Sequence, residues 1–158
     1  MLRRTALLTA LLCLATQTAQ AHTGSHDLVP WGLGAGFLHP LSGLDHVLAM
    51  VAVGMLAAPR GGGVQWSLPA TFMGMMALGG VAGTLMPLPF VEMGITGSVV
   101  ILGGVLAVGQ RLSSVTALLL VGLLALFHGH AHGSEIPAQA HGLLHGAGFI
   151  LATALLHA

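Results

Sequence analysis

Two histidines and one aspartate in the stretch 39–46 are the first candidates for a chemically active site in this sequence. His39 and His46 are seven residues apart, so they share one face of a helix if that helix is continuous through Pro40. Asp45 lies about 100° around such a helix from His46, so it either binds an ion beside His46 or orients the ring. Imidazole and carboxylate groups without sulfur suit divalent metals such as Ni²⁺, Co²⁺, Zn²⁺, Cu²⁺ and Fe²⁺. The stretch therefore predicts one part of a metal site.

The stretch 128–135 carries the same chemistry. His128 and His132 are four residues apart, and Glu135 lies seven residues after His128, spacings that favour one face of a helix. Because the two stretches lie on different segments, we expect their polar side chains to converge on one cavity. The histidines that are secondary candidates for metal binding are His22, His26, His130, His141 and His145.

The composition places these groups in a membrane protein. Of the 158 residues, 55% are apolar and only 5% are charged, and the 10 histidines outnumber the 4 lysines and arginines. So few charges could not cover the surface of a soluble domain. A nucleic-acid partner is excluded as well, since binding it takes a basic face. We therefore exclude an ordinary soluble enzyme and a disordered region, and expect imidazole to be the main polar chemistry of a membrane-embedded chain.

The first segment is typical of a secretory signal peptide. A basic start and an apolar run precede a small-residue cleavage site that ends at Ala21. We therefore predict a signal peptide over 1–21 and a mature transmembrane domain over 22–158, with a retained first helix as the alternative. Cys13 leaves with the signal peptide, so we exclude disulfides, thiolate metal sites and iron–sulfur clusters from the mature chain.

The rest of the chain has the pattern of membrane-spanning helices, each of which needs about 20 apolar residues. Residues that end helices separate five such segments. They are one within 29–58 with its core at 41–58, then 66–86, 90–110, 112–127 and 142–158. We therefore predict an all-α polytopic transmembrane helix bundle of about five spans. His128 is expected at the end of the fourth span. Pro40 marks a kink or a helix boundary, so the segment before it could form a separate short helix.

Three pairs of glycines predict close contacts between these helices. Small residues spaced four apart let helix backbones approach each other in lipid. The pairs are Gly32/Gly36, Gly79/Gly83 and Gly142/Gly146.

The basic residues predict how the spans are oriented across the membrane. A cleaved signal peptide leaves the mature N-terminus in the periplasm, and alternating spans then place Arg60 and Arg111 on the cytoplasmic side. With this topology nine of the ten histidines and all four carboxylates fall in the outer half, and only His157 lies near the cytoplasmic side. Ionisable groups inside a membrane are retained where they line a path or a site. The pattern therefore favours a metal path that opens to the periplasm.

Two strings in the sequence carry a resemblance to a known family. Residues 39–46 read H-x5-D-H, and residues 127–135 read F-H-G-x-A-H-G-x-E. Both resemble the signature motifs of the HupE/UreJ family of small nickel permeases. The flanking stretches 36–40 and 50–54 and the C-terminal stretch 148–157 are similar to that family as well.

The resemblance implies nickel uptake across the bacterial inner membrane, which supplies hydrogenase or urease maturation. The family's metal-handling residues then correspond to His39, Asp45, His46, His128, His132 and Glu135, with His130 at a variable position. The expected substrate is Ni²⁺, with Co²⁺ as the alternative, and no cofactor is permanently bound. The expected partners are the metal ion, the lipid bilayer and, indirectly, the maturation proteins, with a homo-oligomer left open. Family members usually have six spans, one more than expected here.

Other functions remain as alternatives. A cobalt or zinc permease and a membrane metal chaperone or sensor would use the same ligands. An enzyme is disfavoured, because His141 and His145 resemble only part of the histidine boxes of membrane di-iron oxygenases. The chain has no Walker-type phosphate loop, so transport would proceed by facilitated diffusion or secondary coupling.

Overall fold

The computed structural model describes residues 32–108, 112–135 and 142–157. The regular structure in these ranges is entirely helical. Its elements are α2 (Leu33–Ser42), α3 (Leu44–Ala57), the 3-10 helix η2 (Ala58–Arg60), α4 (Gly62–Leu85), α5 (Val91–Val108), α6 (Ser114–Glu135) and α7 (Gly142–Leu156). Several sequence-based predictions lie outside the described residues, namely the signal peptide over 1–21, His22, His26, Arg111 and His141.

Three of these helices are long and apolar enough to cross a membrane, namely α4, α5 and α6. The pair α2 and α3 passes the same test as one bent span, and α7 is apolar but has only 15 residues. The all-α polytopic membrane fold that the sequence predicts is therefore confirmed. The number of five spans stays a prediction.

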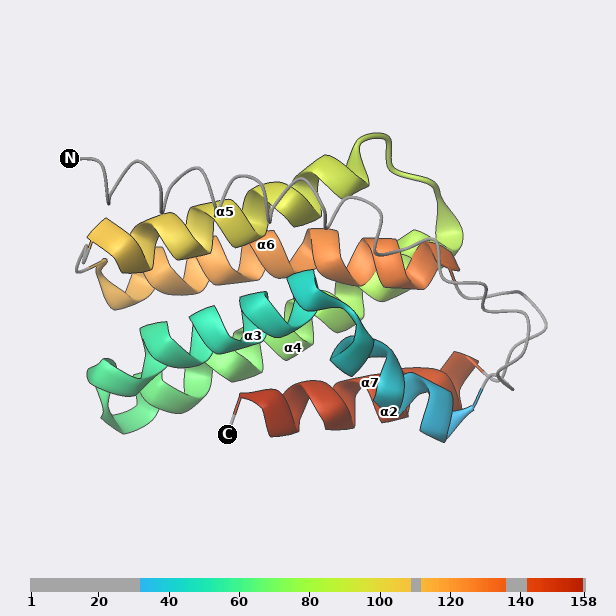
Figure 1. Cartoon of the computed structure of the whole chain (residues 1–158), viewed down its shortest axis with the longest axis horizontal. Helices are drawn as coiled ribbons and strands as arrows, with labels where there is room; N and C mark the ends of the chain where they lie inside the picture. The colour runs from blue at the N-terminus through green and yellow to red at the C-terminus, as the bar shows by residue number, and fades with distance from the viewer. Residues whose placement is uncertain (1–31, 109–111, 136–141, 158) are drawn as a thin grey trace, which may run out of the picture.

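The helices lie side by side, as Figure 1 shows for α3, α4, α5 and α6. The closest pairing is between α4 and α6, and α2 lies against the first half of α7. The η2 turn reverses the chain between α3 and α4, and Gly61 there has a positive φ of 61° that favours glycine. These pairings bring α2, α3, α6 and α7 together around the polar residues.

Glycines bring α4 and α6 into backbone contact. A Cβ on Gly129 or Gly133 of α6 would overlap a carbonyl oxygen of α4, and one on Gly79 or Gly83 would overlap a carbonyl oxygen of α6. Contacts this close are characteristic of helix packing in membranes. The predicted packing role of Gly79 and Gly83 is therefore confirmed.

A second glycine contact joins α2 to α7. A Cβ on Gly36 would overlap the backbone of His145, and one on Gly148 would overlap the backbone of Leu33. Among the described residues no atom lies within 4 Å of the position that a Cβ on Gly146 would take, so the predicted helix contact at Gly146 is not found in this part of the chain. Positions 146 and 148 are about 200° apart around a helix, and only the face of Gly148 meets α2.

The first predicted span is broken, and the break lies at Gly43 rather than at Pro40. Pro40 is inside α2, whereas Gly43 has an extended backbone with φ −87° and ψ 111°. The helices on its two sides are bent by 79°. The proposed core of one continuous span over 41–58 is therefore wrong, and the seven-residue spacing of His39 and His46 does not place them on one helix face.

The fourth predicted span does not end at His128. Helix α6 continues to Glu135, and the histidines of the second motif are buried within it rather than lying in a loop. Histidine and glycine are poor helix formers. Packing of this segment against α4 offsets that weakness, because most helix stability in proteins comes from tertiary contacts.

Candidate metal centre

Five of the six primary candidate ligands meet inside the bundle, in two groups of three. The rim group consists of His39, His132 and Glu135, and the buried group consists of His46, His128 and His132. Within each group the potential ligand atoms all lie within 4.8 Å of one another. A small movement of the side chains would bring each set onto a single ion, and His132 belongs to both.

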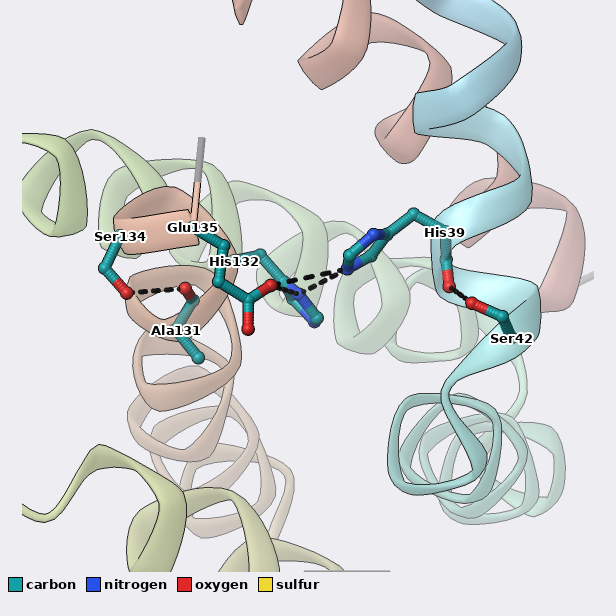
Figure 2. A network of polar contacts seen from close by, with 6 residues as sticks. All are labelled: His39, Ser42, Ala131, His132, Ser134 and Glu135. Carbon is teal, nitrogen blue, oxygen red and sulfur yellow. Dashed lines mark hydrogen bonds and ion pairs between the residues drawn. The ribbon is translucent and has the colours of Figure 1, made fainter. Parts of the chain in front are cut away.

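The rim group offers two nitrogens and one carboxylate. His39 Nε2 and His132 Nδ1 share a hydrogen bond of 3.0 Å, and Glu135 Oε2 lies 3.7 Å from each of these nitrogens. Figure 2 shows His132 and Glu135 of α6 pointing toward His39 of α2. The side chains of His39 and Glu135 are 13% and 28% exposed, so this group is reachable from solvent.

The buried group offers imidazole nitrogens alone. The side chains of His46 and His128 are completely buried, and His132 is 9% exposed. The ring centroid of His46 lies 5.7 Å from that of His128 and 5.2 Å from that of His132. His46 comes from the first turn of α3, and the other two lie one turn apart on α6. Three neutral imidazoles form a set that suits nickel, copper and zinc.

Ser98 of α5 fixes the tautomer of His128. Ser98 Oγ lies 2.6 Å from His128 Nε2 and 2.6 Å from the carbonyl oxygen of Ile95. A hydroxyl has one proton and a carbonyl only accepts, so Ser98 donates to Ile95 and accepts from the Nε2–H of His128. The lone pair of neutral His128 is therefore on Nδ1, which becomes the atom for a metal ion.

Helix α7 covers the remaining side of both groups. Thr153 Oγ1 lies 3.3 Å from His46 Nε2. The ring of Phe149 lies 4.9 Å from that of His46, 4.7 Å from that of His132 and 5.8 Å from that of His39, measured between centroids. These contacts hold the imidazole rings in place.

Asp45, the sixth primary candidate, lies outside both groups that the described residues form. It is 7% exposed and belongs to the first turn of α3, where the positive end of the helix dipole favours a carboxylate. A Cβ at Gly43 would lie 2.9 Å from Asp45 Oδ1. Gly43 therefore leaves room for this carboxylate next to His46, and a role for Asp45 in metal handling stays a prediction.

The secondary candidates differ in their positions. His130 Nε2 donates a hydrogen bond of 3.0 Å to the carbonyl oxygen of Met86, at the end of α4 and outside both groups. His145 is buried, and its ring centroid lies 5.7 Å from that of His39, next to the rim group. Neither belongs to a group of three ligands among the described residues.

In the second motif, candidate metal ligands alternate with glycines that pack against a neighbouring helix. His128 and His132 belong to the buried group, whereas Gly129 and Gly133, each one residue later, contact α4. Residues four apart share a helix face, so the string places ligands on one face and backbone contact on the next. The glycines therefore hold α6 at a fixed rotation, with His128 and His132 turned toward α2 and α3.

Sequence reasoning missed Ser98 and Thr153. Both are fully buried and contact a histidine of the buried group. Each is a hydroxyl residue within an otherwise apolar stretch of helix, and a polar group in such a place is the signal that could have found them. Ligating histidines commonly have such partners on the ring nitrogen that does not bind the metal.

Comparisons with known proteins agree on one family. A family profile described as HupE / UreJ protein matches residues 9–158. The chain is also similar to Protein HupE of Rhizobium leguminosarum bv. viciae, with 44% identity over 151 residues. This match covers 94% of the chain and 78% of that relative. No solved structure matches the chain.

Proposed function

Because the chain belongs to the HupE/UreJ family of hydrogenase and urease accessory membrane proteins, we propose that it is a permease that takes up Ni²⁺ across the bacterial inner membrane. The observation that carries the proposal is the sharing of His132 by two three-ligand groups inside an apolar bundle. A permanent metal site needs one such group. Two groups with a common ligand are suited to passing an ion along.

The proposed transfer begins at the rim group. A hydrated ion exchanges its first water molecules for Glu135 and His39, which are partly exposed. While His132 keeps hold of the ion, His46 and His128 replace those two ligands. Each exchange replaces one bond by another, so the ion need not lose its whole coordination shell at once. Conduction also requires each site to bind weakly enough for release, which favours sites of three ligands over a closed cage.

We also propose a direction and a driving force for transport. The mature N-terminus would lie in the periplasm after cleavage of the signal peptide, and the rim group would open to the same side. Transport would proceed by facilitated diffusion or secondary coupling, and the imported ion would supply hydrogenase or urease maturation. The nitrogen and oxygen donors also accept Co²⁺ and Zn²⁺, so these ions are the competing substrates.

The test is metal flux into liposomes that hold the purified protein. A trapped indicator quenched by Ni²⁺ would report influx, with His46→Ala and Asp45→Asn as site variants and His130→Gln as the matched control. We expect wild-type influx that both site variants lose and the control retains. Protein that binds Ni²⁺ in detergent but leaves the vesicle lumen free of metal would contradict a permease and indicate a chaperone or sensor. Added Co²⁺ or Zn²⁺ would rank the substrates by competition.

A further inference from the structure

One face of α7 lies against both the rim group and the buried group. The residues of this face are spaced four apart, and they are His145, Phe149, Thr153 and His157, the last directly after the helix. His145 lies beside His39 of the rim group, and Phe149 contacts both groups. Thr153 contacts His46 of the buried group. The face thus continues past both groups and ends in an imidazole that belongs to neither.

The ring of His157 is oriented by a bond to its own helix. His157 Nδ1 lies 2.8 Å from the carbonyl oxygen of Thr153, and since a carbonyl only accepts, Nδ1 carries the proton. The lone pair of the neutral ring is therefore on Nε2. This nitrogen is buried and makes no hydrogen bond within the described part of the chain. His157 thus presents a metal-binding atom in the bundle interior.

Phe72 lies next to both His157 and the buried group. Its ring is completely buried, and its centroid lies 6.3 Å from that of His46, 5.9 Å from that of His128 and 5.4 Å from that of His157. The carbonyl oxygen of His157 lies beside Gly54, about two turns further along α3 than His46. His157 is therefore on the side of the buried group that leads away from the rim, toward the turn at Arg60.

We propose that His157 is the exit ligand of the metal path and that the ring of Phe72 is the gate in front of it. The inference rests on the proposed permease function and adds a third step to it. When the Phe72 ring turns aside, a bond from the ion to an imidazole of the buried group is replaced by a bond to His157 Nε2. The ion stays divalent and no proton moves, because the accepting nitrogen already carries a lone pair. The closed ring keeps the ion in the buried group between these events.

The experiment compares flux with binding in the full chain. His157→Asn keeps an amide donor for the Thr153 carbonyl and removes the ligand nitrogen, so it separates a structural role from an exit role. We expect His157→Asn to bind Ni²⁺ in detergent within about twofold of wild type and to lower the initial influx into liposomes by about tenfold or more. Phe72→Leu is expected to raise influx by about twofold, because a smaller side chain opens the constriction. Thermal unfolding of each variant accompanies both assays.

The outcomes separate the exit role from the function it rests on. Wild-type influx at His157→Asn would overturn the exit ligand and leave the permease standing. Loss of Ni²⁺ binding at His157→Asn in a protein that unfolds at the wild-type temperature would also overturn it, because His157 would then belong to the loading site. A Phe72→Leu protein with unchanged or lower influx would overturn the gate. Absence of influx in wild type would overturn the permease itself.

Discussion

The rim group and the buried group share His132, yet they differ in exposure and in donor atoms. The rim group includes a carboxylate that is 28% exposed, whereas the buried group consists of three histidines in the bundle interior. A carboxylate at an accessible site attracts a hydrated cation, and neutral imidazoles bind it after water has been removed. In the proposed transfer, capture and dehydration of the ion would therefore fall to different residues, with His132 common to both steps.

His132→Ala is the largest test of this comparison, because it removes the ligand that both groups use. We expect a fall of about 100-fold or more in both Ni²⁺ affinity and influx, since loss of a ligand or its support typically changes metal affinity by one or two orders of magnitude. Equilibrium dialysis in detergent and influx into liposomes measure the two quantities. The shared-ligand model is wrong if His128→Ala, which affects one group, is as harmful as His132→Ala in both assays.

The next test separates the two groups by their kinetics. Glu135→Gln keeps the shape of the rim ligand but removes its charge, so we expect the Ni²⁺ concentration for half-maximal influx to rise by about tenfold at a nearly unchanged maximal rate. His46→Gln changes the buried group, and we expect a maximal rate about tenfold lower. Influx measured over a range of Ni²⁺ concentrations distinguishes these effects. Identical kinetic changes in the two variants would show that the groups act as a single site.

The sequence predicts the chemistry of both groups better than their geometry. The spacing of His128, His132 and Glu135 predicts a face of candidate ligands, and Gly79 and Gly83 predict a helix contact that the structure confirms, because both patterns are local properties of one helix. His39 and His46 are different. Their spacing suggests a common face, but they come from two helices bent by 79° at Gly43 and they join different groups.

The rest of the site depends on how helices are rotated against one another. Pro40 is a stronger helix breaker than Gly43 on its own, yet the chain bends at Gly43, where α3 must turn to pack against its neighbours. The contact of Ser98 with His128 joins α5 to α6, and that of Thr153 with His46 joins α7 to α3. A hydrophobic pattern fixes which residues are apolar, but it does not fix which helix each face meets. These contacts therefore follow from tertiary packing.

Ser98→Ala tests the support of the buried group, because it changes a partner of His128 rather than a candidate ligand. The variant removes the acceptor that holds the Nε2–H of His128, so the ring can rotate or change its tautomer. We expect Ni²⁺ affinity to fall by about tenfold, in the range seen for outer partners of ligating histidines. Ser67→Ala is the matched control, since Ser67 Oγ also donates to the carbonyl oxygen three residues earlier and has no histidine partner in the described structure. Equal affinities for the two variants would contradict the tautomer argument.

His130→Gln has the smallest expected effect, although it removes a histidine from the middle of the second motif. His130 lies between His128 and His132, the two candidate ligands of α6, but its ring is directed to the Met86 carbonyl. A glutamine amide can donate the same hydrogen bond, so we expect Ni²⁺ affinity and influx to stay within about twofold of wild type. The comparison of the two groups depends on orientation rather than on the number of imidazoles. Loss of influx in a His130→Gln protein that still folds would mean that the path runs along the α4 side of α6, and the division into a rim and a buried group would have to be redrawn.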